Sequence, residues 1–401
     1  MPEPTVNPQS IQPTLEMIST ELQGLGVHQI ASFAWRDLDD PDAGGSEVHA
    51  DQVFSRWAST GLHITHRTSS ASGTREFERN GYQVVQRAGR YGVFPRVITH
   101  QLLNKHHYDA VIEIWNGVPW FSSLWARRPH VTWLHHIHTD MWKESLPAPL
   151  APFGRLLEGT IAPSFYKAHP VITLAPATSD HLLSHGYKSD LIHVIAPGID
   201  ASFTNLNAAP RSPSPLICAV GRLAPVKQFD ALIRQMKIIT QQLPDARLVI
   251  VGDGPQRAEL QHLIDHLGLT QQVSLLGHIS NQELVSLYQS SWLLTSASHS
   301  EGWGMTITEA AACATPCVVL DNDGHRGAVK HNVSGLIVPT LDDLGLAVLR
   351  VLLEPPLQKT LSDGALMHAK SFTWDATATR TLGVLLDETK RQHRSNKRTD
   401  R

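Results

Sequence analysis

The sequence lacks the features that mark several large classes of protein. Its 401 residues include three cysteines, Cys218, Cys313 and Cys317, which are too few for a disulfide framework; we expect the last two to pack in a core rather than bind a metal. No apolar run approaches the ~20 residues of a membrane span. Residues 1–13 are polar and proline-rich and do not form a signal peptide, so we expect a cytoplasmic protein.

An excess of charge of one sign is also missing. The formal net charge is −3, so the chain has no global basic field of the kind that nucleic-acid binders carry, and it contains no nucleic-acid-binding motif. No G-x-G-x-x-G follows the first expected strand, which argues against a nicotinamide dehydrogenase. Positive charge gathers at the C-terminal end, where we expect residues 391–401 to form a frayed basic tail.

What is present is a repeated alternation of short apolar runs with helical patterns. The length favours two domains, and the alternation predicts parallel sheets in an α/β fold. Residues 205–215 are rich in proline and small polar residues, which indicates a linker. We therefore expect one domain over 1–204 and a second over 205–371, with an amphipathic helix at about 372–390. The clearest expected strands are 28–33, 63–68, 108–115, 131–134, 216–220 and 246–251.

One stretch, residues 299–309, organises the rest. Glu301 and Glu309 lie eight residues apart on either side of a glycine loop that leads into a helix. We expect Thr306 or Thr308 to cap that helix. A helix N-terminus attracts phosphate, whereas a nearby carboxylate suits the hydroxyl groups of a sugar. The stretch therefore favours a ligand that has both, although a simple helix start with favourable acids is the alternative.

Glycines follow other expected strands, at the edge of an α/β sheet where ligands bind. Gly44 and Gly45 enter a helix after an acidic run, residues 37–42, which we interpret as a solvated loop rather than a metal site. Gly221 is followed by Arg222 and Lys227, two cations that suit a diphosphate.

Histidines gather at the end of the expected strand 131–134, in the run His135-His136-Ile137-His138. A zinc site, an ordinary polar loop and an active-site histidine are all compatible with this pattern. No cysteine or carboxylate with ligand spacing completes a metal site nearby.

Taken together, these motifs resemble the GT-B glycosyltransferases, specifically the large retaining group called family 4, also known as glycosyl transferases group 1. The resemblance covers roughly residues 28–390. It rests on the order and spacing of six motifs, which are 44–47, the histidine cluster, 197–200, 221–227, 252–255 and the acid pair 301 and 309. It implies two Rossmann-like domains with parallel sheets that face each other across a cleft, and helix 372–390 crossing back to the first domain.

The resemblance also implies roles for individual residues. Arg222 and Lys227 would clamp the donor diphosphate, and Glu309 would hold the ribose hydroxyls. Glu301 would face the donor sugar. One histidine would lie over the reacting carbon, with His136 as the first choice and His135 as the second. The remaining donor contacts would come from Gly44, Gly45, Gly277, His278, Trp303, Gly304, Met305 and Thr306.

The implied activity is retaining transfer of a hexose-type sugar from a nucleotide-diphosphate sugar, UDP before GDP, to a hydroxyl of a sugar, glycolipid or small natural product. Clamping by cations implies that neither a metal nor another cofactor is needed. A lipid acceptor would bring peripheral membrane contact. A nucleotide-sugar epimerase on the same fold and a non-catalytic nucleotide-sugar-binding protein are the alternatives.

The sequence departs from the family pattern at two places. Ala314 stands where family members commonly have glycine, so we expect an unstrained φ there and a slightly different turn. No acidic residue stands near Gly327, where one is common.

Overall fold

The computed structural model describes residues 13–41, 43–70, 73–103, 108–136, 151–206, 208 and 210–399. Contacts between residues divide the chain into two compact units. Unit 1 comprises Met1–Glu113, Ser122–Val131 and Ala378–Arg401, and unit 2 comprises Ile114–Phe121 and Thr132–Thr377.

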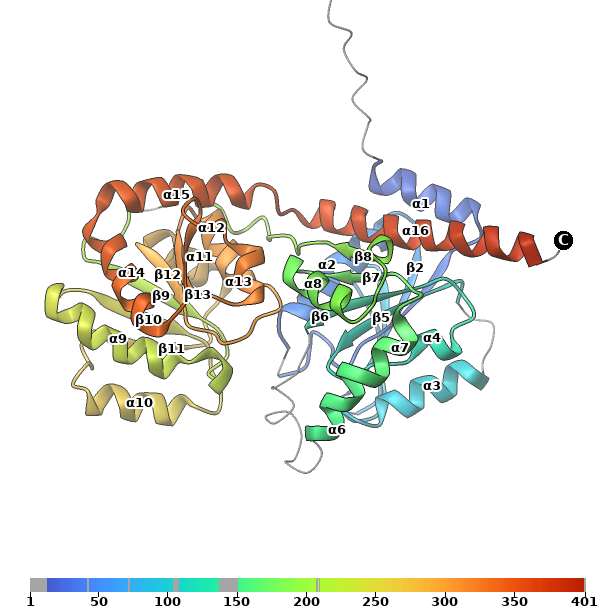
Figure 1. Ribbon diagram of the computed structural model, residues 1–401, viewed down its shortest axis with the longest axis horizontal. Helices are drawn as coiled ribbons and strands as arrows, with labels where there is room; N and C mark the ends of the chain where they lie inside the picture. Colours follow the sequence, from blue (N-terminus) through green and yellow to red (C-terminus); the bar gives the residue numbers. More distant parts are fainter. Residues whose placement is uncertain are drawn as a thin grey trace, which may run out of the picture. The chain divides into compact units, whose positions relative to one another are not determined.

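The first sheet has eight strands in the described part, in the order β3-β4-β2-β1-β5-β6-β7-β8 (Figure 1). Every pairing is parallel except that of β3 with β4, among the pairings that the described residues define. The strands are β1 Gln29–Phe33, β2 His63–Thr68, β3 Arg75–Arg79, β4 Tyr82–Gln86, β5 Ala110–Asn116, β6 His130–His136, β7 Val171–Thr173 and β8 Ile192–Val194.

Helix α1 precedes the first strand of this sheet, and other helices connect most of its parallel strands. The helices are α1 Leu15–Gly24, α2 Gly45–Ser59, α3 Val93–Leu103, α4 Ser122–Trp125, α6 Ala151–Leu156, η2 Leu157–Ile161, α7 Ala162–Tyr166, α8 Pro176–Ser184 and η3 Ser189–Leu191. Aromatic side chains of α2 form part of the core of unit 1, where the ring of Phe54 lies 5.7 Å from that of Trp57 and 5.9 Å from that of Tyr82. The Trp57 indole also donates a hydrogen bond to Ala378 O (3.0 Å), which ties α16 (Trp374–Thr399) to this core.

The second sheet has six parallel strands in the described residues, in the order β11-β10-β9-β12-β13-β14. The strands are β9 Leu216–Val220, β10 Arg247–Val251, β11 Val273–Gly277, β12 Leu293–Ser296, β13 Cys317–Leu320 and β14 Gly335–Val338. The helices are η4 Pro225–Lys227, α9 Phe229–Gln242, α10 Arg257–His266, α11 Asn281–Ser290, α12 Met305–Ala312, α13 Asp323–Ala328, α14 Leu341–Leu353 and α15 Pro355–Ala369.

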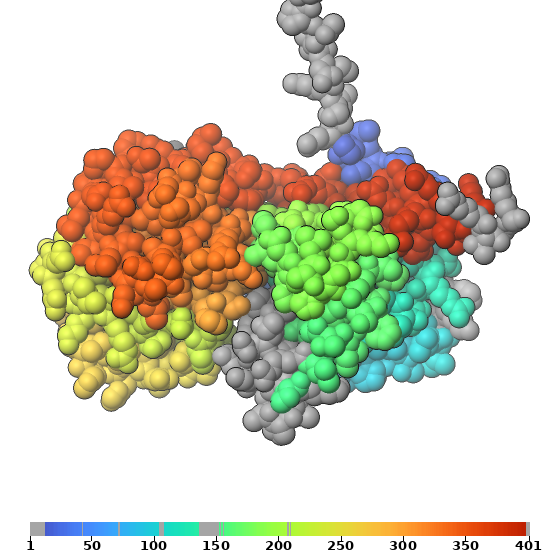
Figure 2. Space-filling model, viewed as in Figure 1, coloured from blue at the N-terminus to red at the C-terminus, as the bar shows by residue number. Residues whose placement is uncertain are grey.

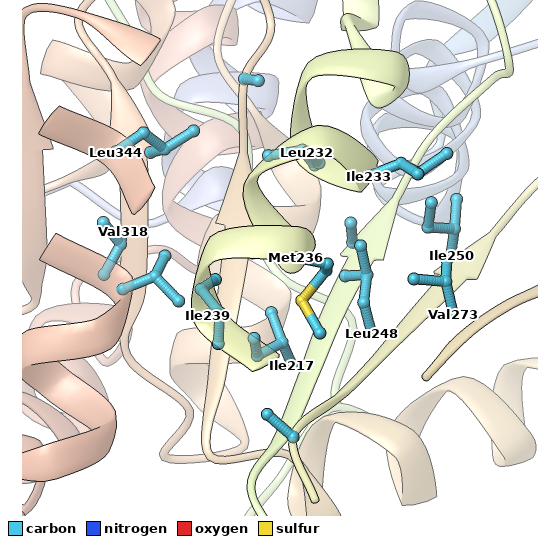
Figure 3. Packing of buried hydrophobic residues seen from close by; sticks show 14 of the residues in the cluster. Ile217, Leu232, Ile233, Met236, Ile239, Leu248, Ile250, Val273, Val318 and Leu344 are labelled. Carbon is cyan, nitrogen blue, oxygen red and sulfur yellow. The ribbon is translucent and has the colours of Figure 1, made fainter. Parts of the chain in front are cut away.

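Both faces of the second sheet are buried, because alternate residues of a strand point to opposite faces. In β9, Ile217 packs in one apolar cluster with α9, α10 and α14, whereas Cys218 packs in another with α11 and α12. Figure 3 shows Leu232 and Met236 of α9 lying over the sheet near Leu248. Figure 2 shows α9 and α10 (yellow) and α14 and α15 (orange to red) on the outside of this part of the chain. The predicted α/β fold with two parallel-sheet domains is therefore confirmed.

The three cysteines are buried and form no disulfide, as expected for core residues. At Ala314, however, the expectation of an unstrained φ is wrong. Its φ is +59°, in the left-handed region that favours glycine, because it ends α12 in a turn where Thr315 N–H returns to Ala310 O (2.9 Å). This chain therefore keeps the turn that glycine would form and bears the strain of a Cβ, about 1–2 kcal/mol.

The expected frayed tail is also wrong as far as the structure describes it. Helix α16 continues to Thr399, well beyond the predicted end at about 390. One ion pair joins α16 to α1, with Lys390 2.7 Å from Glu21, and a second lies within the helix, with Arg391 2.6 Å from Glu388. Among the described helices none is both long and apolar enough to cross a membrane.

Candidate active site

The loop between β12 and α12 has a backbone that only glycine forms easily. Gly304 has a φ of +99° and precedes the first residue of α12, Met305. A Cβ at Gly304 would also lie 2.9 Å from Cδ1 of Ile307. The prediction that Thr306 or Thr308 caps this helix is wrong, because the helix begins before either threonine. Thr308 instead donates from Oγ1 to Met305 O (2.9 Å) inside the helix.

Lys227 and Glu301 are brought together from positions far apart in the sequence. Lys227 ends η4 after β9, and its Nζ forms an ion pair with Oε1 of Glu301 in the loop before α12. Both side chains are largely buried, with exposed fractions of 23% and 17%. The two loops are also joined by His299 N–H donating to Val226 O (2.9 Å).

The charge of Glu301 is stabilised by its surroundings. Burial by itself raises the pKa of this carboxyl group, but attraction to Lys227 and His325 and hydrogen bonds from Lys227 and Ser298 outweigh it. The pKa therefore lies below its ordinary value, and Glu301 is ionised at neutral pH. The ion pair places one cation and one anion side by side at the start of α12.

Glu309 is in a different electrostatic environment, within α12. Burial raises its pKa to about 7, opposed by a hydrogen bond from the Tyr288 hydroxyl (3.4 Å) and assisted by repulsion from Asp200. Two carboxylates of one motif thus differ in charge near neutral pH, because Glu301 has a cation beside it and Glu309 lies beside a tyrosine and near Asp200.

Glycines bring the loops after β9, β10 and β11 close together. A Cβ on Gly252 would lie 2.0 Å from Gly221 O, and one on Gly254 would lie 2.5 Å from Leu223 O. The Gly277 carbonyl accepts a hydrogen bond from Gly252 N–H (2.9 Å), which joins the end of β11 to the loop after β10. This packing leaves the Arg222 and His278 side chains exposed at the ends of their strands.

Trp303, in the loop between β12 and α12, is buried. A Cβ on Gly327 would lie 2.7 Å from its ring, and the ring of Phe372 lies edge-on at 5.4 Å. Its indole N–H is buried and has no hydrogen-bond partner among the described residues. Thus Gly327, whose lack of a side chain permits this close approach, makes room for the tryptophan.

In unit 1, Gly44 is the N-cap of α2, and its N–H donates to Oε2 of Glu47 (2.7 Å). The φ of Gly44 is −146°, which any residue adopts, and a Cβ there would meet only Glu47, at 3.8 Å. Gly45 is the first residue of the helix. Internal packing therefore does not require glycine at position 44.

The acidic run before this helix is not simply a solvated loop, as the sequence predicted. Asp37 is buried, and both of its carboxylate oxygens accept from the Arg79 guanidinium (2.9 Å each). Gln86 donates to the same carboxylate (2.7 Å). Asp42 lies outside the described residues. No group of three or more metal-ligating side chains gathers in the parts of the chain that the structure describes.

The histidine cluster lies at the C-terminal end of β6. His135 is buried, and burial lowers its pKa to about 4, so its imidazole is neutral at physiological pH. His136 closes the strand, but its side chain lies outside the described part, as do residues 137–150 with His138.

Two residues beside the Lys227–Glu301 pair were missed in the sequence. His325 in α13 is fully buried, and it attracts Glu301 electrostatically. Asn322 caps α13 by accepting from His325 N–H (2.9 Å) and donates to Ser298 O (2.7 Å). The run 321–327, which directly follows β13 at a strand end, was the available signal.

Comparison with known proteins agrees with this architecture. Residues 43–203 match the sequence model of Glycosyltransferase Family 4, and residues 206–366 match that of Glycosyl transferases group 1. D-inositol 3-phosphate glycosyltransferase of Saccharomonospora viridis is 33% identical over 217 residues, which are 49% of this chain and 49% of that protein. The match thus spans about half the length of this relative. The enzyme of the same name from Kribbella flavida is 27% identical over 86% of this chain and 92% of its own.

Solved structures with lower identity show the same fold. Sucrose-phosphate synthase from Thermosynechococcus elongatus superposes with a TM-score of 0.72 at 20% identity, over 88% of this chain and 97% of that one. Anabaena Alr3699/HepE in complex with UDP-glucose gives a TM-score of 0.67 at 19% identity, over 88% and 98%. The chain therefore belongs to the GT-B glycosyltransferases, family 4 and group 1.

Proposed function

We propose that this chain is a retaining glycosyltransferase that moves a hexose from a nucleotide-diphosphate sugar to a hydroxyl acceptor. The observation that carries the proposal is the Lys227–Glu301 ion pair at the start of α12, with Glu309 on the same helix. This arrangement supplies a cation for phosphate, a carboxylate for sugar hydroxyls and a helix N-terminus in one place.

The diphosphate is assigned to Arg222 and Lys227. Both follow β9, and their charges would stabilise the leaving nucleotide as its negative charge grows in the transition state. Because two cations supply this stabilisation, we propose that transfer needs neither a divalent metal nor another cofactor. A rate that is unchanged by EDTA is the expected outcome.

The carboxylates and the glycine loop are assigned to the rest of the donor. Glu301 accepts hydrogen bonds from sugar hydroxyls, and Glu309, once ionised, accepts from those of the ribose. Backbone N–H groups of Trp303, Gly304, Met305 and Thr306 line the sugar and phosphate. Gly277 and His278 border the base. The backbone freedom of Gly304 suits a close approach between chain and ligand.

Unit 1 and the β6 strand are assigned to the acceptor side. Packing within the chain does not require glycine at position 44, and this supports a role for Gly44 and Gly45 in letting the backbone approach a ligand. In this proposal one histidine lies over the reacting carbon, with His136 as the first choice and His135 as the second. Transfer proceeds by departure and attack on the same face of the sugar, and the leaving phosphate accepts the acceptor's proton. No enzyme nucleophile takes part.

Relatives guide the choice of donor and acceptor. HepE was solved with UDP and with UDP-glucose, and the relatives from Saccharomonospora viridis and Kribbella flavida bear the name D-inositol 3-phosphate glycosyltransferase. We propose UDP as the nucleotide, with GDP as the second choice. The proposed acceptor is a hydroxyl of a sugar, glycolipid or small natural product.

Calorimetric binding of UDP, GDP and ADP tests the donor site. One tight binder is expected, and Lys227→Ala should weaken it by about 10- to 100-fold, since a charged hydrogen bond contributes about 1.5–3 kcal/mol. Lys237→Ala, on the exposed face of α9, is the matched control. Unchanged affinity in Lys227→Ala would remove this residue from the clamp, and failure of all three nucleotides to bind would argue against the function.

Product analysis separates the alternatives. The chain is incubated with the glucose or mannose conjugate of the nucleotide that binds, together with a panel of hydroxyl acceptors. NMR of the product should then show the same anomeric configuration as the donor sugar. An inverted product contradicts the retaining mechanism. A new sugar nucleotide formed without any acceptor indicates an epimerase, and binding without turnover of any conjugate indicates a binding protein.

A further inference from the structure

A second basic group, His325 of α13, lies next to the loop that carries Glu301. His325 has no accessible surface, and its Nδ1 lies 2.5 Å from Leu320 O and 2.9 Å from Asn322 Nδ2. Its Nε2 is buried and has no hydrogen-bond partner among the described residues. A buried ring nitrogen without a partner is costly, which suggests a partner in another state of the molecule.

The free edge of this ring faces the loop that carries Glu301. A Cβ on Gly304 would lie 3.6 Å from Cδ2 of His325, the ring carbon next to Nε2. A Cβ on Gly324 would lie 2.5 Å from Glu301 O and 2.7 Å from Glu301 Cβ. Only glycine at position 324 therefore lets α13 pack this closely on Glu301.

Charged groups act on His325 from three elements. Glu301 attracts a proton to the ring, whereas Lys227 on η4 repels it, and burial lowers the pKa of the imidazole. Asp321 at the end of β13 also attracts a proton, but its carboxylate is already paired with Arg326 (2.6 and 2.7 Å). Lys227 is the paired counter-charge of Glu301, and burial together with repulsion by Lys227 disfavours the charged form of His325.

We propose that His325 replaces Lys227 as the charge partner of Glu301 when a nucleoside diphosphate draws the lysine away, by taking up one proton from solvent on Nε2. The inference rests on the proposed assignment of Lys227 to the diphosphate. Binding removes the repulsion by Lys227 and leaves a buried carboxylate without its cation, and both changes favour the imidazolium ion. His325 is thus a positioning residue, which keeps Glu301 ionised and in place for the sugar.

Proton uptake is measured by calorimetry of UDP binding at pH 7 in two buffers that differ in ionisation enthalpy. The wild-type chain should take up about 0.5–1 proton more per UDP than His325→Gln, which keeps a hydrogen-bonding side chain but does not titrate. Protons exchanged by the terminal phosphate of UDP, whose second pKa is about 6, and by Glu309 cancel in this difference. His262→Gln, on the exposed surface of α10, should match the wild type.

Glu301→Gln provides a second variant, in case His325→Gln does not fold. It removes the charge that the imidazolium ion pairs with, and it should lose the same fraction of a proton while still binding UDP. Equal proton counts in the wild type and either folded variant would overturn the role of His325 and leave the proposed function intact. No UDP or GDP binding in the wild type would instead overturn the proposed function, and this inference with it.

Discussion

Glu309→Gln should stabilise the protein while weakening its nucleotide site. In the folded chain the pKa of Glu309 is about 7, whereas an ordinary glutamate titrates at 4.5. Between these values the folded chain keeps a proton that the unfolded chain has lost, so its stability falls as pH rises through this range. The full difference corresponds to about 3 kcal/mol above pH 7, an upper limit because the side chain keeps some exposure.

Glutamine removes this cost because it is never charged, and its amide oxygen still accepts the Tyr288 hydroxyl. Thermal unfolding should therefore show a gain of roughly 5–10 °C or less at pH 8 and almost none at pH 4.5. The same change should weaken nucleotide binding at pH 8 by about 10- to 100-fold, because a neutral amide is a poorer acceptor for ribose hydroxyls than a carboxylate.

The assay is a pair of pH series, one of unfolding temperature and one of nucleotide affinity. Glu259→Gln, an exposed acid in the first turn of α10, should change neither series. A variant that is less stable than the wild type at pH 8 would refute the electrostatic reasoning. A variant that is more stable but binds nucleotide equally well would refute the assignment of Glu309 to the ribose.

Two further predictions concern packing and a buried ion pair. Gly327→Ala places a Cβ 2.7 Å from the Trp303 ring and should cost about 1–3 kcal/mol in chemical unfolding, with a change in tryptophan fluorescence; an unchanged midpoint would show that the ring moves freely. Asp37→Asn removes the carboxylate that pairs with both terminal nitrogens of Arg79, which keeps its ion pair with Asp39 (2.9 Å), and should cost about 1.5–3 kcal/mol at pH 7. Because the pKa of Asp37 is held low against burial mainly by Arg79, this loss should shrink as acid protonates the carboxylate, and a pH-independent loss would contradict it.

Much of the fold was predictable because its causes are local in the sequence. A buried parallel strand such as 110–116 is mostly apolar, with Glu113 as an exception among its buried residues, and the helices between strands have their own periodicity. Glycines at strand ends mark loops with unusual backbones, as the positive φ of Gly304 confirms. Helix starts were less certain, because a glycine cap at Gly304 leaves no side-chain signal and Thr306 offered a false one.

Only part of the candidate site could be predicted, because sequence patterns connect only residues that are close together in the chain. Its members Glu301 and Glu309 share one short motif, and the glycine loop and helix start between them favoured a ligand with both phosphate and hydroxyl groups, with a simple helix start as the alternative. His325 lies 24 residues further along and belongs to a different helix, so nothing local connects it with the motif. Likewise, the sequence showed Asp37 as one acid in a charged run, and its burial depends on Arg79 from another strand.

By itself, therefore, the amino-acid sequence determined the α/β order of elements, the two parallel sheets and the loops at their strand ends. Hydrophobic periodicity and glycine placement act over a few residues and leave a readable pattern. Only the tertiary structure decided which charges meet: Lys227 with Glu301, and His325 beside them. It also decided the different pKa values of two acids in one motif, because burial and neighbouring charges depend on the order of strands in the sheet.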